Sequence, residues 1–303
     1  RGKRLLSAWD REDSNKGAGM YNKNSSLTVA NCTFSDNQVA TISTSSFFDI
    51  AGYGAGMYND HSAPIVSNCT FTNNKAGGLD IVPYPRCAYG LGGGMDNECY
   101  FGTSEEVQWP VITDCTFSDN EAGGRLPPYI LNFWETGGGG MYNHDCYVTV
   151  DSCTFVRNSA TQGGAMLNDY GAPKITNSIF SANFTTALYD YGFGGAIFNI
   201  GDYALIMNCT FYQNGGLHYP NMITTQTGGA IYLYYSHSII ANSVFMENGV
   251  IGSGGVTGSG GAIVNAGPNP NSRPSLYNNL FYYNISWDGW YTPTYVIIDH
   301  VSG

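Results

Sequence analysis

The sequence predicts an all-β protein, a single right-handed parallel β-helix of about eight coils with three short strands in each coil. Three observations support this prediction. Two short motifs alternate eight times along the chain, the spacing between them is nearly constant, and no segment has the apolar periodicity of a helix. The right-handedness follows from the general rule for crossovers between parallel strands.

The composition agrees with a folded, glycine-rich chain. Gly accounts for 40 of the 303 residues, charged residues for 12 % and hydrophobic residues for 43 %. Low charge combined with many hydrophobic residues argues against disorder, and the glycines lack the three-residue period of collagen. No apolar run approaches the length of a membrane-spanning helix, so we expect no membrane span.

The first motif is a triplet of small residues followed by an apolar residue, and it usually ends in Asn. We expect the Met or Ile of each copy to end a short strand and to point into the core. The copies are GAGMYN at Gly17 and Gly54, GGGMDN at Gly92, GGGMYN at Gly138, GGAMLN at Gly163, GGAIFN at Gly194, GGAIYL at Gly228 and GGAIVN at Gly260.

The second motif, Phe-x-x-Asn, follows 14 residues after the Met or Ile in six of the eight repeats. Stacked coils turn each repeated position into a ladder of like residues, so the Phe side chains are expected to form a core column. The Asn side chains are expected to form a ladder of amides that satisfies backbone groups at the corners. This Asn ladder comprises Asn37, Asn74, Asn120, Asn158, Asn183, Asn214, Asn248 and Asn284.

Two repeated positions, one five residues and one two residues before each Phe, indicate a corner in the backbone. An aliphatic residue lies five residues before every Phe, and a Cys, Ser or Asn lies two before it. The spacing of two from Cys to Phe is strand alternation, whereas the spacing of three from the aliphatic residue breaks it. The break predicts a tight corner between two short strands, at which an Asn accepts the left-handed backbone conformation.

The shortest repeat decides the architecture. The distances between successive Phe residues are 37, 46, 38, 25, 31, 34 and 36 residues. A repeat of 25 residues is too short for a propeller blade of roughly 40 residues or more, but it suffices for one coil of a β-helix. We therefore predict an N-terminal cap or assembly segment at 1–16, the β-helix at 17–284, and a C-terminal strand or assembly segment at 285–303.

The repeats resemble those of known proteins. The pairing of GGA[I/L/V] with FxxN is similar to the repeats of the polymorphic outer-membrane proteins of chlamydiae. The form GGGMYN…NCTFSDN resembles still more the secreted parallel β-helix proteins of environmental bacteria, over roughly residues 17–284. The resemblance implies the fold and an extracellular or cell-surface location, and it implies no particular activity, since the shared residues are structural.

The charge and the sequons agree with secretion. A net charge of −11 argues against nucleic acid or an anionic membrane as a partner. Of the six Asn-x-Ser/Thr sequons, Asn24 lies outside the motifs and is the best candidate for glycosylation. The other five coincide with predicted corners, where we expect the side chain to be unavailable; they are Asn31, Asn68, Asn183, Asn208 and Asn284.

The cysteines fall into two groups. Five share one inward column and are expected to be small buried thiols: Cys32, Cys69, Cys115, Cys153 and Cys209. Cys87, Cys99 and Cys146 lie outside this column, and a disulfide among these three is expected. Cys99 and Cys146 follow the first motif in consecutive coils and are the candidate pair. No ligand spacing points to a metal or a cofactor, so we expect neither.

One outward column carries aromatic residues directly after the Met or Ile: Tyr21, Tyr58, Asp96, Tyr142, Leu167, Phe198, Tyr232 and Val264. It is either a surface for sugars or proteins or a strip covered by the long loops, and we favour the covered alternative. A second wall, beside the Phe column, changes from hydroxyl-bearing to apolar residues toward the C-terminus. Candidate assembly contacts are Val244, Met246, Leu280 and Tyr282, together with the strand-like run Tyr295, Val296, Ile297 and Ile298.

These features predict a non-enzymatic, extracellular structural or adhesin-like protein that assembles end to end into a homopolymeric filament or surface layer. The alternative is a carbohydrate-active or carbohydrate-binding β-helix, with glycans as partners. Its site would be an acidic edge after the first motif, formed by Asp60, Glu98, Asp145 with His144, and Asp169. A merely solvated acidic edge is the simpler interpretation of the same residues, and no catalytic residue is assigned.

Overall fold

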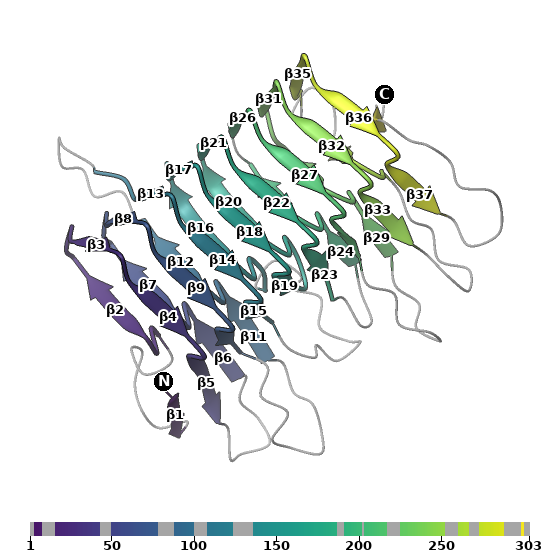
Figure 1. Ribbon diagram of the computed structural model, residues 1–303. Helices are drawn as coiled ribbons and strands as arrows, with labels where there is room; N and C mark the ends of the chain where they lie inside the picture. The colour runs from purple at the N-terminus through teal and green to yellow at the C-terminus, as the bar shows by residue number, and fades with distance from the viewer. Residues whose placement is uncertain are drawn as a thin grey trace.

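The chain forms an elongated stack of parallel β-strands, with the two ends of the chain at opposite ends of the stack (Figure 1). The computed structural model describes residues 3–7, 16–42, 50–77, 88–99, 108–123, 136–186, 191–201, 203–216, 225–251, 260–266, 273–287 and 298–299. All regular secondary structure in these residues is β-strand. The all-β parallel solenoid predicted from the repeats is therefore confirmed.

Four long parallel sheets run along the stack, and each coil contributes one strand to each of them. The methionine sheet begins each coil with the Met or Ile of the first motif: β2 (Met20–Lys23), β7 (Met57–Asp60), β12 (Met95–Glu98), β16 (Met141–Cys146), β20 (Met166–Gly171), β25 (Ile197–Ile200), β30 (Ile231–Tyr234) and β34 (Ile263–Ala266). A ninth strand, β38 (Ile298–Asp299), follows outside the motif copies.

The aliphatic sheet follows in each coil: β3 (Thr28–Ala30), β8 (Ile65–Ser67), β13 (Val111–Thr113), β17 (Thr149–Asp151), β21 (Lys174–Thr176), β26 (Leu205–Met207), β31 (Ile239–Ala241) and β35 (Ser275–Tyr277). The phenylalanine sheet comes next: β4 (Thr33–Ser35), β9 (Thr70–Thr72), β14 (Thr116–Ser118), β18 (Thr154–Val156), β22 (Ile179–Ser181), β27 (Thr210–Tyr212), β32 (Val244–Met246) and β36 (Leu280–Tyr282).

A closing sheet completes each coil: β1 (Lys3–Ser7), β5 (Gln38–Ile42), β10 (Lys75–Ala76), β15 (Glu121–Ala122), β19 (Ser159–Ala160), β23 (Phe184–Thr185), β28 (Gly215–Gly216), β33 (Gly249–Ile251) and β37 (Ile285–Trp287). Two small sheets lie in the loops before the first motif, one of β6 (Ile50–Tyr53) with β11 (Ala88–Leu91), the other of β24 (Tyr191–Phe193) with β29 (Thr225–Thr227).

The prediction of the strands in each coil was wrong in two respects, their number and the start of the first strand. A fourth strand follows the Asn of each Phe-x-x-Asn motif, and this strand is often only two residues long, too short to leave an alternating pattern. The strand of the first motif begins at the Met or Ile instead of ending there, as β7 does at Met57. The small residues before it form a turn, with Gly54 at a φ of 55°.

The small residues of this turn are required by close packing between coils. A Cβ atom at Gly139 would lie 2.3 Å from the carbonyl oxygen of Ser159 and 2.5 Å from that of Gly164. Both neighbours are backbone atoms, which have little freedom to move aside. In this coil the central residue of the triplet must therefore be Gly, whereas Ala55 occupies the same position in the second coil.

The predicted corner before each Phe is confirmed. The residue three before every Phe has a positive φ between 50° and 56°: Asn31, Asn68, Asp114, Ser152, Asn177, Asn208, Asn242 and Asn278. A second left-handed corner, which the sequence analysis missed, lies at the residue just before the Asn of each Phe-x-x-Asn motif. It accepts residues as different as Arg157, Ala182 and Tyr283, so it leaves little trace in the sequence.

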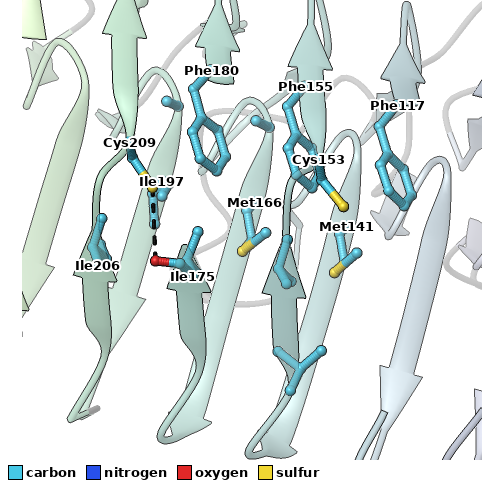
Figure 2. Packing of buried hydrophobic residues seen from close by; sticks show 14 of the residues in the cluster. Phe117, Met141, Cys153, Phe155, Met166, Ile175, Phe180, Ile197, Ile206 and Cys209 are labelled. Atoms are coloured by element: carbon cyan, nitrogen blue, oxygen red, sulfur yellow. Dashed lines mark hydrogen bonds between the residues drawn. The ribbon is translucent and has the colours of Figure 1, made fainter. Parts of the chain in front are cut away.

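The core is one continuous apolar column, part of which is shown in Figure 2. Successive Phe rings stack nearly parallel, with ring centroids 4.7 Å apart for Phe117 and Phe155 and 4.9 Å apart for Phe155 and Phe180. The six inner rings, from Phe71 to Phe245, are completely buried. Met141 and Met166 of the methionine sheet lie in the same core as these rings.

Two ladders of asparagine amides run beside this core, and the one formed by the Phe-x-x-Asn motifs was predicted. The backbone N–H and the Nδ2 of Asn120 both donate to Oδ1 of Asn158, at 3.1 and 2.9 Å, and the same Nδ2 donates to the carbonyl oxygen of Phe71. A second ladder links the Asn residues of the first motif, for example Asn97 to Asn143 at 2.8 Å. These amides satisfy polar groups that the coils bury at the corners, although Nδ2 of Asn199 in the second ladder has no hydrogen-bond partner in the described residues.

The cysteines are arranged as the sequence predicts, except that Cys32 was wrongly expected to be buried. Cys99 and Cys146 form a disulfide between consecutive coils. Of the five column residues, all free thiols, Cys69, Cys115, Cys153 and Cys209 are buried, whereas Cys32 in the first coil is exposed. Cys87 lies outside the described residues.

The predicted terminal segments contribute strands to the stack. Strand β1 pairs in parallel with β5, from Lys3 opposite Gln38 to Ser7 opposite Ile42. At the other end, β37 pairs with β33 and β38 pairs with β34, where Ile298 lies opposite Ile263. Tyr295, Val296 and Ile297 lie outside the described residues.

Candidate functional site

The aromatic column that follows each Met or Ile is covered, as we expected. Tyr58, Tyr142, Leu167 and Phe198 are buried on the outer face of the methionine sheet. Side chains from the loops before the first motif, including Leu91, join them in a second apolar cluster outside the main core.

Asp96 occupies this apolar strip in the third coil. It lies opposite Tyr58 on one side and Tyr142 on the other. The side chain is fully buried, and neither oxygen of its carboxyl group has a hydrogen-bond partner in the described part of the chain. Burial, and secondarily the nearby Glu98, raises the pKa of Asp96 well above its usual value. A buried polar group without a partner is rare in folded proteins and calls for an explanation.

A row of ionisable groups lies two residues further along the same strands. Strand alternation places these side chains on the same outer face as the covered column. The row contains Lys23, Asp60, Glu98, His144 and Asp169 in consecutive register, and we call it the carboxylate row. Three of the predicted acidic residues are thus brought together. The simpler interpretation as a solvated edge is wrong for Asp60 and Asp169, whose side chains are only 9 % and 17 % exposed.

The fourth predicted residue, Asp145, follows His144 in β16 and lies beside the row. Its backbone has a φ of 52°, so it departs from the strand alternation that aligns the others. Its Oδ2 lies 3.6 Å from Nε2 of His144, while Nδ1 of His144 lies 3.1 Å from Oδ2 of Asp169. The bond to Asp169 raises the pKa of His144 to about 9. His144 is therefore a cation held between two carboxylates at neutral pH.

Asp60 and Glu98 are neighbours in the row but have opposite environments. Burial disfavours ionisation of Asp60, but contacts with His61, Tyr21 and Lys23 outweigh it and lower the pKa of Asp60. The Tyr21 hydroxyl donates to Oδ2 at 2.9 Å, Lys23 Nζ lies 3.3 Å from the same oxygen, and His61 Nδ1 contacts Oδ1.

For Glu98, the contacts that favour the ionised form do not outweigh the effect of burial. Burial raises its pKa, and the carboxylates of Asp169 and Asp60 add to the effect, whereas His144 and Lys16 oppose it. Glu98 therefore holds its proton to a higher pH than Asp60 does. Two adjacent carboxyl groups whose environments push their pKa values apart are typical of acid–base pairs.

A row of exposed tyrosines continues from the carboxylate row, and the sequence analysis missed it. We call these four residues the tyrosine ledge. They lie in consecutive coils where the methionine sheet leads into the aliphatic sheet, and they are Tyr147, Tyr170, Tyr203 and Tyr235, exposed by 46, 56, 66 and 37 %. Tyr147 and Tyr170 follow closely after Asp145 and Asp169, so the two rows meet.

The ledge is held in place by local contacts. The Tyr170 ring lies over Gly201, where an added Cβ would approach Cδ1 of Tyr170 to 2.7 Å. Tyr203 stacks on His237 with ring centroids 5.3 Å apart. Tyr170 and Tyr235 have φ values of 56° and 53°, because they occupy the left-handed corner that follows the methionine-sheet strand, as His61 and Asp145 do in other coils.

Other predicted positions lie elsewhere on the stack. Asn24 is exposed at a corner after β2, as a glycosylation site requires. Among the corner sequons, Asn31, Asn68 and Asn208 are exposed, while Asn183 and Asn284 are buried. Nδ2 of Asn68 donates to Oδ1 of Asn31, and Nδ2 of Asn208 donates to Oδ1 of Asn177. Among the candidate assembly contacts, Val244 and Met246 are half-buried, while Leu280 and Tyr282 are exposed.

The described residues contain no group of three or more His, Cys, Asp or Glu side chains arranged to hold a metal ion. They also include no helix of the length and hydrophobicity needed to cross a membrane.

Comparison with known proteins supports the fold. Residues 10–85 match the family model described as a right handed beta helix region. A search of curated proteins and a search of solved structures each returned no match. Together with the parallel sheets and the asparagine ladders, the matched region defines the chain as a right-handed parallel β-helix.

Proposed function

We propose that this chain is an extracellular or cell-surface β-helix that binds neutral carbohydrate along the tyrosine ledge and the adjoining carboxylate row. The observation that carries the proposal is the exposure of Tyr147, Tyr170, Tyr203 and Tyr235 in four consecutive coils. A tyrosine offers an apolar ring face and a polar tip, which suits the apolar and hydroxyl-bearing faces of a sugar. The carboxylates beside the ledge accept hydrogen bonds, which sugar hydroxyls donate.

The charges favour a neutral glycan over an acidic one. The row contains the cations Lys23 and His144, but these are already paired with Asp60 and Asp169. The whole chain has a net charge of −11, which repels polyanions such as uronic acid polymers. A neutral polysaccharide meets no such barrier.

Three features support an extracellular location. The Cys99–Cys146 disulfide is of a kind that persists in oxidising compartments. Exposed sequons such as Asn24 are available for glycosylation if the chain is secreted. The repeats resemble those of the polymorphic outer-membrane proteins and of secreted β-helix proteins, which favours a surface or secreted protein of the adhesin type.

Substitution of ledge residues tests this proposal. Tyr170→Ala and Tyr203→Ala should each weaken binding to a neutral polysaccharide by about tenfold, or about 1.4 kcal/mol, because each removes one stacking surface. Affinity electrophoresis against a panel of neutral and uronic polysaccharides measures the effect. Tyr277→Ala is the matched control, since Tyr277 is equally exposed (56 %) but lies in the aliphatic sheet of the last coil. Equal loss in the control, or no binding by the wild type, would contradict the proposal.

A second candidate function, end-to-end assembly with further copies of the chain, is favoured by the state of the terminal coils. Phe34 and Phe281 are only partly buried, whereas the six rings between them are completely buried. A further coil stacked on either end would continue the Phe column and the parallel sheets. Head-to-tail contacts of this kind generate open filaments.

Electron microscopy and light scattering at increasing protein concentration test the assembly. We expect particles that lengthen with concentration, and Leu280→Lys should keep the wild-type fold while shortening them. Monodisperse short rods at high concentration would rule out assembly by copies of this chain.

A further inference from the structure

We infer that a hollow in the last coils binds a small organic cation with an apolar body, such as an aryl or alkyl ammonium ion. The hollow lies where β32 and β36 lead into β33 and β37, near the C-terminal end of the stack (Figure 1). We call it the C-terminal hollow; its volume is about 540 Å³, and its lining includes Gln213, Glu247, Gly249, Tyr282, Tyr283 and Ile285. It lies at a different corner of the coil from the tyrosine ledge, so its ligand is independent of carbohydrate binding there.

The hollow is present because the closing sheet has glycine where other coils have a side chain. The first residue of each closing strand is half-buried and the second is buried, so the first faces outward. In the second to fifth coils the first residue is Lys75, Glu121, Ser159 and Phe184. It is Gly215 in the sixth coil and Gly249 in the seventh, which are register partners, and Ile285 follows in the last.

The space over Gly249 is not needed for packing. Among the described residues, a Cβ atom added at Gly249 would lie 3.4 Å from the carbonyl oxygen of Ile285 and 3.9 Å from its Cβ. Both are ordinary van der Waals contacts, unlike the close backbone approach at Gly139. The absence of a side chain at Gly249 therefore leaves room for a ligand.

The last coil gives the hollow an aromatic wall. Tyr282 and Tyr283 are 52 and 53 % exposed, and their ring planes meet at 75° with centroids 4.5 Å apart. The face of a tyrosine ring attracts a cation that lies within about 6 Å of the ring centroid. Ile285 beside them offers an apolar surface for the body of the ligand. A hollow of this size, with aromatic and aliphatic walls and few polar groups, is typical of small-molecule sites.

The carboxylate of Glu247 gives the hollow its negative charge. Gln213 Nε2 donates to Oε2 of Glu247 at 2.9 Å, and the Tyr212 hydroxyl contacts the same carboxylate. Both neighbours are neutral, so they orient the carboxylate without neutralising it, and an ionised carboxylate has about four lone pairs to share. Glu247 is exposed, and within the described ranges it forms no ion pair with Lys, Arg or His.

Another coil shows what Glu247 lacks. Asp119 has the same repeat position, two residues after the Phe, and Arg157 of the next coil binds it through Nε at 2.7 Å and Nη2 at 2.8 Å. In the coil after Glu247, this position is occupied by Tyr283 instead. An aromatic ring thus replaces the arginine beside the carboxylate, and a bound ammonium ion would supply the missing positive charge. The net charge of −11 also attracts cations to the chain.

Isothermal titration calorimetry with benzyltrimethylammonium tests this binding, with benzyl alcohol and methyl β-glucoside as neutral probes. We expect one ammonium ion per chain, bound about tenfold more tightly than benzyl alcohol and less tightly as salt is added. Glu247→Gln should weaken binding about fivefold, and Tyr282→Ala about two- to fivefold. Gly249→Val should abolish binding, because the valine side chain fills the hollow.

Glu121→Gln is the matched control. It makes the same change of charge in the closing sheet of the third coil, where Lys75 Nζ lies 2.8 Å from the Glu121 carboxylate, and it should leave the affinity unchanged. Circular dichroism checks the fold of Gly249→Val, which we expect to be native because valine favours strands. If that variant is unfolded, the comparison of Glu247→Gln with Glu121→Gln still decides.

Four results would each overturn this assignment. They are no saturable binding of the ammonium ion, equal affinity for benzyl alcohol, equal loss of affinity in Glu121→Gln and Glu247→Gln, and tighter binding of methyl β-glucoside than of the ammonium ion. The last would make the C-terminal hollow a sugar site. None of the four bears on the substitutions in the tyrosine ledge, so the two proposals fail separately.

Discussion

Phe155→Ala is expected to lower the free energy of unfolding by about 3–5 kcal/mol, the usual cost of truncating a large aromatic side chain in a core. Phe155 is completely buried, and its ring stacks between those of Phe117 and Phe180 at centroid distances of 4.7 and 4.9 Å. The cavity has little chance to collapse, because the register of the sheets holds the neighbouring coils at a fixed spacing.

Phe281→Ala is the matched control for this prediction. Phe281 has the same position in the repeat but is only partly buried, and among the described residues its ring stacks on that of Phe245 alone, at 5.0 Å. We expect it to cost less than half as much as Phe155→Ala. Urea unfolding followed by circular dichroism measures both variants. Equal losses would show that the column does not act as a stack of mutually supporting coils.

Asp96→Leu is expected to raise the free energy of unfolding by about 1–3 kcal/mol at neutral pH, the cost of leaving a polar group buried without a partner. The substitution is compatible with the site, because the same column contains the completely buried Leu167 two coils further along. The prediction is unusual in sign, since most substitutions of buried residues destabilise a protein.

The gain from Asp96→Leu should depend on pH. Because burial raises the folded-state pKa of Asp96 above its usual value of 3.8, the native state binds the proton more tightly than the unfolded state does. The resulting stability is fully present below about pH 3.8 and is lost as the pH rises through the folded pKa. The advantage of the variant over the wild type should therefore grow from pH 4 upward.

Asp96→Asn separates charge from polarity in the same experiment. It removes the ionisable group but keeps a buried polar group, so its stability relative to Asp96→Leu should not vary with pH. Glu98 and His144 also titrate, but they are present in all three proteins, and differences between the proteins report mainly on position 96. A wild type that gains on the Leu variant as the pH rises would show that Asp96 has a stabilising partner as a carboxylate.

The fold was predictable because the coils repeat the same physical requirements eight times. The Phe column, the asparagine ladders and the left-handed corner before each Phe all recur at fixed positions, and the structure has them where the spacing places them. The fourth strand was missed because a strand of two residues, such as Lys75–Ala76, shows no alternation. The second corner was missed because residues as different as Arg157 and Tyr283 occupy it.

The candidate site was predicted only in part. Asp60, Glu98 and Asp169 were recognised because they follow the first motif at one offset. Their contacts with side chains of adjacent coils, such as that of Asp60 with Tyr21, are not visible in the spacing. Asp96 was seen as a member of the covered column, yet its lack of a partner is visible only in three dimensions. The tyrosine ledge was missed because its members do not share one repeat position: Tyr147 and Tyr203 lie six residues after the Met or Ile of the first motif, whereas Tyr170 lies four residues after it.

The crystal structure of the chain with an oligosaccharide from the neutral polysaccharide that it binds is the most direct test of the proposed function. We predict sugar rings stacked on Tyr170 and Tyr203, with hydroxyl groups directed toward Asp169 and the rest of the carboxylate row. A saccharide bound on the outer face of the phenylalanine sheet or at the terminal coils, with the tyrosine ledge bare, would contradict the proposal.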